Sequence, residues 1–281
     1  MPAILPIAVL ILGSVMLAVV AWRGALRRDA LTAGPSRRVG LKPADLLISL
    51  GLMIVGPACV GLILPQDPDP AQTDVVRWAT RVLLVQIVGQ GLPVAYMLIR
   101  TTSAVDGWRR LGVIPARPGR DVIWGFMGLL VAAPMVMGTI QATVLIGEIF
   151  GQEAPRIAHD MLKVMVNSDS FIGTVMLIFS ALIVAPVLEE ALFRGLVQTV
   201  MVETAGEEQR WGVVLTASFI FAIIHADTAT FENWQALPGL FVLGVVLGWL
   251  YERSGSLLPG IVVHMGFNTI NVVMALTVAP G

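Results

Sequence analysis

Eight apolar runs of about the length that crosses a lipid bilayer follow one another along this sequence. They lie at about 3–22, 45–64, 76–99, 122–149, 171–201, 211–226, 236–251 and 257–279. A helix that spans the hydrocarbon core needs about 20 consecutive, mostly apolar residues. Only 13% of the residues are charged, against roughly 25% in soluble domains, so there is too little polar surface to coat a water-soluble globule. The sequence therefore predicts an all-α fold, a polytopic membrane helical bundle with about eight transmembrane helices.

Net charge and cysteine content restrict the possible partners and metal sites. The formal net charge is -1, so nothing indicates a nucleic-acid partner. Cys59 is the single cysteine, which excludes an intrachain disulfide and any site built from several cysteines. The lipid bilayer is the one partner that composition alone predicts.

Basic residues are concentrated in two loops. Six Lys or Arg residues lie between 23 and 42, and five between 100 and 120. Short loops rich in Lys and Arg stay on the cytoplasmic side, whereas acidic residues contribute little to orientation. We therefore expect the odd-numbered loops in the cytoplasm and both termini outside, in a multi-pass protein of a prokaryotic plasma membrane.

The fifth run carries charges where a membrane helix normally has none. Glu189, Glu190 and Arg194 lie within it, although each ionisable group in a span costs on the order of 2.5–3.5 kcal/mol. Glu190 and Arg194 are four residues apart in the order that favours an ion pair on one helix face. Glu189 points about 100° away and has no local partner, so we expect it to meet water or groups from other helices.

Three further polar residues lie in or at the end of the later runs. The sixth run ends on His225, and the eighth carries His264 and Asn268, which are four residues apart and so share a face. Counted from the same ends of their helices at about 1.5 Å per residue, Glu189 and the two histidines can reach a common depth. A carboxylate, two imidazoles and an amide near one depth are groups that can serve as a base and as hydrogen-bond donors.

Three short motifs in this part of the chain resemble those of one protein family. EEALFR (189–194) matches EExxxR, FAIIH (221–225) matches FxxxH, and HMGFN (264–268) matches HxxxN. In this order they resemble the CPBP (CAAX protease and bacteriocin-processing, Abi) family of intramembrane proteases, which includes the type II CAAX prenyl endopeptidases. The resemblance implies a catalytic helical core of about four helices at 171–279, preceded by about four N-terminal helices at 1–150, around a conical intramembrane cavity.

The resemblance also implies a role for each motif residue. Glu189 would be the base that activates water, and His264 would help to hold that water. His225 and Asn268 would donate hydrogen bonds to the oxyanion. Glu190 and Arg194 would support the site.

The participation of a metal stays open at this point. Glutamate catalysis requires no cofactor, and this is the mechanism we favour. The alternative is a zinc ion held by Glu189, His225 and His264 with water in the fourth position, in which case Glu190 would have to be the base.

The sequence thus predicts an intramembrane endopeptidase that hydrolyses a peptide bond of a membrane-associated or lipidated peptide or protein with glutamate-activated water. The alternative is a non-catalytic membrane scaffold or bacteriocin self-immunity protein of the same fold. A proton-coupled transporter fits less well, because such bundles are built from repeated halves, and here the candidate Glu and His residues of the spans, Glu189, Glu190, His225 and His264, all lie in the second half.

Overall fold

Every element of the computed structural model is a helix, in the part of the chain that it describes. The described residues are 4–32, 34–36, 38–64, 74–152, 160–226 and 234–278. The eight predicted spans correspond to α1 (Ile4–Trp22), α2 (Pro43–Ile63), α3 (Val75–Thr101), α5 (Pro118–Ile149), the continuous helical stretch Phe171–Ala205, α10 (Arg210–Ile224), α11 (Leu237–Ser254) and α12 (Leu258–Val278). Two short helices, α4 (Gly107–Arg110) and α6 (Asp160–Val166), lie in connections. The predicted all-α membrane fold is confirmed.

Six of the eight helices are long and apolar enough to cross a membrane. Of the other two, α1 (Ile4–Trp22) has 19 residues, and α10 is the shortest of the eight. With 15 residues, α10 extends about 22 Å at 1.5 Å per residue, less than the roughly 30 Å of the hydrocarbon core. A helix end at membrane depth is tolerated where protein covers it. His225 directly follows the last residue of α10, and its partly buried ring lies against Phe221.

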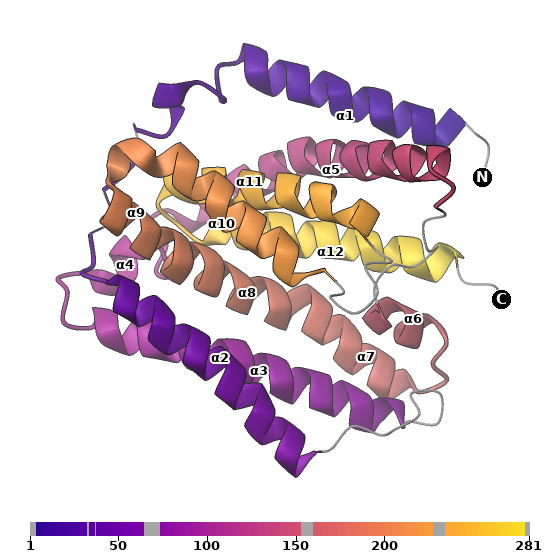
Figure 1. Cartoon of the computed structure of the whole chain (residues 1–281), viewed down its shortest axis with the longest axis horizontal. Helices are drawn as coiled ribbons and strands as arrows, with labels where there is room; N and C mark the ends of the chain where they lie inside the picture. The colour runs from indigo at the N-terminus through magenta and orange to yellow at the C-terminus, as the bar shows by residue number, and fades with distance from the viewer. Residues whose placement is uncertain are drawn as a thin grey trace.

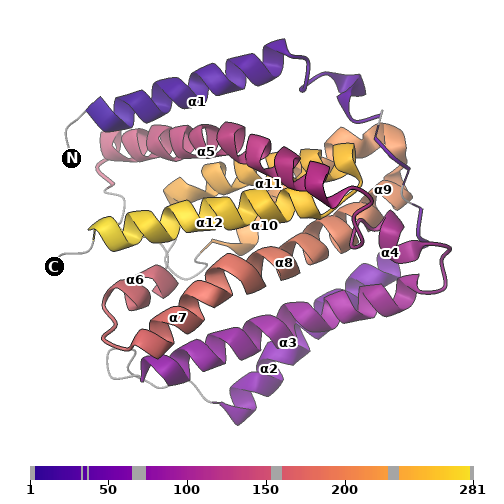
Figure 2. The same cartoon turned by 180° about the vertical axis from the view of Figure 1, so that it is seen from behind.

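The helices are arranged in layers (Figure 1). The pair α2–α3 forms one outer side, α1 packs on α5 at the opposite side, and the stretch Phe171–Ala205 lies between them with α10, α11 and α12. Seen from behind, α1 begins and α12 ends at the same end of the bundle (Figure 2). Contacts of α5 with α11 and α12, and of α3 with α7, join the N-terminal helices to the later ones.

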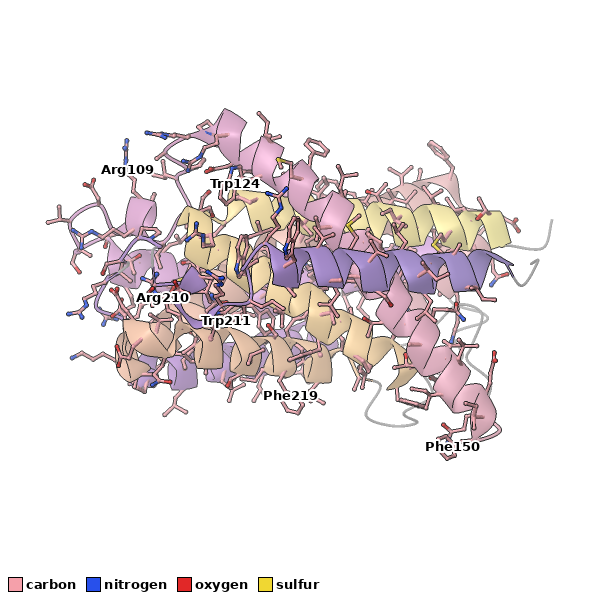
Figure 3. The ribbon with its side chains drawn as sticks, turned by 90° about the horizontal axis from the view of Figure 1, so that it is seen from above. Arg109, Trp124, Phe150, Arg210, Trp211 and Phe219 are labelled. Atoms are coloured by element: carbon pink, nitrogen blue, oxygen red, sulfur yellow. The ribbon has the colours of Figure 1, made fainter. Side chains whose placement is uncertain are left out.

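The segment after α1 lies across one end of the bundle. Arg109 and Arg210 lie at one end and Phe150 at the other (Figure 3). Arg210 is buried, and its guanidinium donates to Leu31 O at 2.9 Å and to Pro35 O at 2.8 Å. These bonds hold the segment after α1 against the start of α10, so the first basic loop covers one end of the bundle.

Local sequence explains where several helices begin and end. Asp74 caps α3 by accepting from the Val76 amide at 2.8 Å, and Ser170 caps α7 (Phe171–Phe179) by accepting from the Gly173 amide at 3.2 Å. Gly255, with φ +67°, ends α11 in the left-handed conformation that glycine adopts without a Cβ clash.

The stretch Phe171–Ala205 is not a regular α-helix. It consists of α7, a π-turn η3 (Ser180–Val184), α8 (Ala185–Glu190), a second π-turn η4 (Ala191–Gln198) and α9 (Thr199–Ala205). Both glutamates therefore sit on a short α-helical segment between two π-turns. Each π-turn inserts an extra residue and changes the direction in which the following side chains point, a feature frequent at functional sites.

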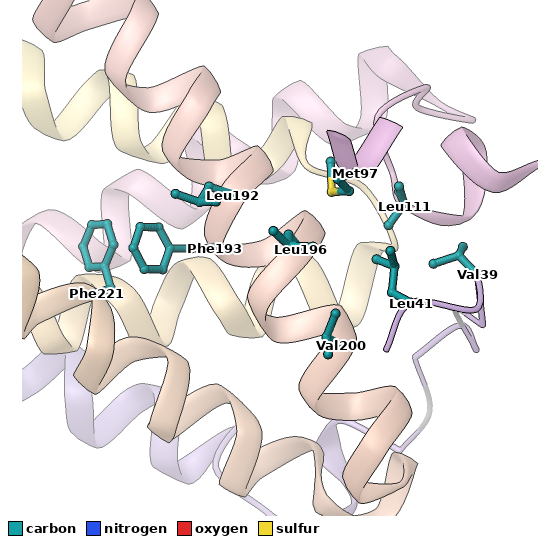
Figure 4. Packing of buried hydrophobic residues seen from close by; sticks show 9 residues of the cluster. All are labelled: Val39, Leu41, Met97, Leu111, Leu192, Phe193, Leu196, Val200 and Phe221. Carbon is teal, nitrogen blue, oxygen red and sulfur yellow. The ribbon is translucent and has the colours of Figure 1, made fainter. Parts of the chain in front are cut away.

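A cluster of buried apolar side chains supports this irregular helix (Figure 4). The cluster joins η4 and α9 to α3, α10 and two connecting segments. It consists of Val39, Leu41, Met97, Leu111, Leu192, Phe193, Leu196, Val200 and Phe221. Because Phe221 and Phe193 belong to it, the cluster holds α10 against the stretch that carries the glutamates.

Candidate active site

The three motifs meet at one carboxylate oxygen. Glu189 projects from α8, His225 follows the last residue of α10, and His264 lies on α12. The Oε2 atom of Glu189 is 3.6 Å from His225 Nε2 and 3.8 Å from His264 Nε2. The structure thus brings together side chains that are separated by up to 75 positions in the sequence, and it gives Glu189 the interhelical partners that the sequence analysis expected.

The second carboxylate has a different environment. Glu190 Oε1 accepts from Arg194 NH1 at 2.8 Å and lies 3.2 Å from His264 Nδ1. Arg194 also donates to Gly244 O at 3.2 Å, and its guanidinium lies 4.9 Å from the centre of the Phe221 ring. The predicted Glu190–Arg194 ion pair is therefore present, and it supports one of the two histidines.

The Nδ1 atoms of both imidazole rings contact oxygen atoms. His225 Nδ1 lies 2.6 Å from Phe221 O, and His264 Nδ1 lies 3.2 Å from Glu190 Oε1. A carbonyl oxygen only accepts, so His225 Nδ1 carries the hydrogen of that bond. The contact between His264 Nδ1 and Glu190 Oε1 likewise fixes the direction of the His264 ring. Both Nε2 atoms are thereby directed at Glu189.

Burial is graded across the site. The exposed fraction of the side chain is 26% for His225, 10% for Glu189 and 5% for His264. Within the described part of the chain, Glu189 Oε2 is buried and has no hydrogen-bond partner, because both ring nitrogens lie beyond direct hydrogen-bonding distance. This oxygen can therefore accept a proton from a reactant, which would approach past His225.

Asn268 lies one helical turn beyond His264, and its amide is directed at the backbone. Asn268 Nδ2 donates to Ala181 O, in η3, at 2.8 Å. The structure thus connects Asn268 to Ala181, which lies five residues before Pro186 in the helical stretch that carries Glu189.

Small residues on α11 allow two neighbours, α10 and the π-turn η4, to approach it closely. A Cβ atom on Gly244 would lie 2.9 Å from Ser218 Cβ, and one on Gly248 would lie 2.9 Å from Gln198 Oε1. The carbonyl of each glycine accepts a side-chain hydrogen bond, from Arg194 and Gln198 respectively. The close approach therefore also orients the polar face of η4.

The sequence analysis missed the contribution of α3. Gln90 lies within interaction range of the Glu189 carboxylate, and its Oε1 atom is buried without a hydrogen-bond partner among the described residues. Gln86, one turn earlier, accepts from Ser180 Oγ at 2.8 Å. A search for ionisable residues passes over glutamine. The available indication was two glutamines four residues apart within an apolar run.

The residues can be compared with the requirements of a metal ion. No group of three or more His, Cys, Asp or Glu side chains is arranged to hold a metal within the described ranges. Nevertheless, the donor set has one property of a zinc site: each histidine uses Nδ1 for an oxygen partner and directs Nε2 at a carboxylate, the orientation typical of zinc-binding histidines. The donor chemistry is therefore compatible with zinc.

Comparison with known proteins supports the resemblance seen in the motifs. Residues 171–270 match the family model of the Rce1-like type II CAAX prenyl endopeptidases. The chain is 27% identical over 143 residues to an uncharacterised 24.3 kDa protein of Escherichia coli, covering 50% of this chain and 64% of that protein. It is 26% identical over 160 residues to a Bacillus subtilis protein named "Putative membrane peptidase YdiL", covering 56% of this chain and 58% of that protein.

The chain thus matches less than two thirds of the length of either relative. No solved structure matches it. The matched segment contains all three motifs, at 189–194, 221–225 and 264–268. The family match therefore confirms, for residues 171–270, the resemblance to the type II CAAX prenyl endopeptidases.

Proposed function

We propose that this protein is an intramembrane endopeptidase that hydrolyses a peptide bond with water activated by Glu189. One observation carries the proposal: the buried Oε2 atom of Glu189, which accepts no hydrogen bond from the described residues, lies 3.6 Å from His225 Nε2 and 3.8 Å from His264 Nε2. This arrangement lies among helices able to span a membrane and within the segment that matches a peptidase family.

In the first step, Glu189 takes a proton from water. The second hydrogen of the same water is donated to His264 Nε2, which is free to accept when Nδ1 carries the ring hydrogen directed at Glu190. The water oxygen then forms a bond with the carbonyl carbon of the substrate. Glu190 and Arg194 contribute by holding the His264 ring in this direction.

The negative charge that develops on the carbonyl oxygen needs hydrogen-bond donors. His225 can donate from Nε2 only if its ring carries both protons, because Nδ1 already donates to Phe221 O. The Glu189 carboxylate, 3.6 Å away, supplies the compensating charge before water is deprotonated. Asn268 donates its second amide hydrogen to the same carbonyl oxygen of the substrate. Glu189 then returns the proton to the leaving nitrogen as the carbon–nitrogen bond breaks.

Zinc is the alternative means of activating water. Glu189, His225 and His264 would hold the ion, and when bound it would lower the pKa of a coordinated water and polarise the substrate carbonyl. In that case, Glu190 would have to serve as base while it remains in contact with Arg194 and His264.

The substrate we propose is a membrane-associated or lipidated peptide or protein. Glu189 lies within a helical stretch that can cross the membrane, so the reactive bond has to reach bilayer depth. His225, the most exposed of the three central side chains, marks the direction of approach. We further propose a prokaryotic plasma membrane as the location, with both termini outside.

The decisive experiment reconstitutes the full chain in liposomes with a library of membrane peptides, both unmodified and farnesylated at a C-terminal cysteine. Fragments are identified by mass spectrometry. Glu189→Gln keeps the shape of the side chain but removes the base. We therefore expect a loss of cleavage rate of at least about 100-fold, with unchanged insertion and folding.

Glu148→Gln is the matched control, because Glu148 is an exposed residue near the end of α5. It should cleave at the wild-type rate. Wild-type cleavage by Glu189→Gln would exclude Glu189 as base. If the wild-type protein cleaves no peptide of either class, this would favour the non-catalytic scaffold or self-immunity protein.

A further inference from the structure

The π-turn η3 contains a carbonyl whose expected backbone donor is missing. At the end of η3, the Ala185 amide donates to Ser180 O, five residues earlier. Continuation of this register would pair the amide of residue 186 with Ala181 O. Residue 186 is proline, which has no N–H. Proline therefore removes the donor that the π register would have supplied to Ala181.

The side chain of Asn268 occupies the position of that missing donor. Its Nδ2 atom donates to Ala181 O at 2.8 Å, and α12 packs against η3 and α8. Ser180, next to this carbonyl, is fully buried, so the surroundings offer little water to replace the bond. A buried carbonyl left without any donor is costly.

We infer that Asn268 is a positioning residue, which replaces the N–H absent from Pro186 and thereby holds the π-turn that directs Glu189 into the site. This inference rests on the proposed function only for its catalytic consequence. It assigns Asn268 a task in addition to any contact of its second amide hydrogen with the oxyanion.

The geometric consequence follows from the position of the turn. Pro186 is three residues before Glu189, and the two belong to the six-residue helix α8. A return from the π register to the α register would rotate the following side chains by about 100° relative to α7. The Glu189 carboxylate would then no longer face both histidine rings. Loss of the Asn268 donor should therefore affect the alignment of the base more than the binding of substrate.

A double-mutant cycle on the full chain tests this inference without requiring a known substrate. The four proteins are the wild type, Asn268→Ala, Pro186→Ala and the double variant. Alanine at 186 restores the backbone N–H that the π register directs at Ala181 O, so the π-turn no longer needs the Asn268 donor. In detergent micelles, Asn268→Ala should lower the thermal unfolding midpoint by roughly 2–12 °C in the wild-type background. In the Pro186→Ala background, the decrease should be less than half as large.

Pro134→Ala is the matched control, since Pro134 lies inside α5. In that background, Asn268→Ala should cause the same decrease as in the wild type. Equal decreases in the wild-type and Pro186→Ala backgrounds would overturn the inference. If Asn268→Ala yields no folded protein, recovery of folded protein by Pro186→Ala supports the inference, and failure in both backgrounds overturns it.

Activity provides a second readout once a cleaved peptide is known. Asn268→Ala should lower kcat with little change in KM, and Pro186→Ala should restore part of kcat, because it restores the alignment of Glu189. A catalytic loss that Pro186→Ala leaves untouched would show that Asn268 acts on the reaction only through its own contact with the substrate, which overturns the positioning role. Failure of the Glu189→Gln test would refute the proposed function and would leave the unfolding cycle valid.

Discussion

Replacement of Arg194 by methionine should be among the most destabilising single changes in this protein. Methionine keeps much of the length of the side chain but removes the charge and every donor. Both partners of the ion pair are almost fully buried, with exposed side-chain fractions of 3% for Arg194 and 1% for Glu190. The change leaves the Glu190 carboxylate with His264 as its remaining neighbour, and it leaves Gly244 O without the guanidinium.

The expected magnitude follows from this burial. Removal of one partner of a buried ion pair costs about 3–5 kcal/mol, because an uncompensated charge remains. Each kcal/mol shifts the unfolding midpoint of a chain of this size by about 2–4 °C. Arg194→Met should therefore lower the midpoint by about 6–20 °C. The double variant Glu190→Gln/Arg194→Met should lose much less, since neither charge remains and glutamine can still accept from His264.

The assay is thermal unfolding of the purified protein in detergent micelles, followed by circular dichroism. Arg120→Met is the control: the Arg120 side chain is 45% exposed and pairs with Asp121 at 3.4 Å, so its loss should cost no more than about 1 kcal/mol. A decrease of less than 3 °C for Arg194→Met would refute the reasoning. So would a double variant less stable than Arg194→Met.

Three further predictions concern packing, the base and the metal. Gly244→Val should lower the unfolding midpoint by about 2–12 °C, because the valine side chain would overlap Ser218. The control Gly51→Ala should leave the midpoint unchanged, since no atom lies within 4 Å of the added Cβ. Equal effects of the two changes would contradict the packing argument. Gln90→Leu should lower kcat about 10-fold at similar KM in steady-state assays, because Gln90 interacts with the Glu189 carboxylate; an unchanged kcat would remove Gln90 from the site. Cleavage should survive exhaustive dialysis against a chelator, with residual zinc measured by mass spectrometry; activity lost by dialysis and restored by zinc would instead establish the metal alternative.

Hydropathy and motif spacing predicted much of the fold because they depend on local sequence. All eight predicted spans are helical, since an apolar run in lipid must satisfy its backbone within the helix. With 15 residues, α10 is too short to cross the hydrocarbon core by itself. The division into residues 1–150 and 171–279 and the orientation of the termini stay predictions.

The candidate site was predictable in its residue types and in the contact within one helix, but not in the geometry of the contacts between helices. Spacing within one helix predicted that Glu190 would pair with Arg194, and the structure shows that pair. Spacing gave no indication that Gln90 on α3 would interact with Glu189, because that contact depends on how two distant helices are rotated against each other. Arg210 is similar: it follows an acidic loop in the sequence, yet it is buried against the segment after α1.

The sequence by itself thus determined a membrane-embedded helical bundle, and it predicted the residues that we propose act on a peptide bond. Tertiary structure alone decided that the two Nε2 atoms face one oxygen of Glu189, that two π-turns flank the glutamates, and that Asn268 donates to Ala181 O. The physical reason is that hydrophobic burial and helix length are properties of each segment. The direction of a side chain, in contrast, depends on the register and packing of several segments at once.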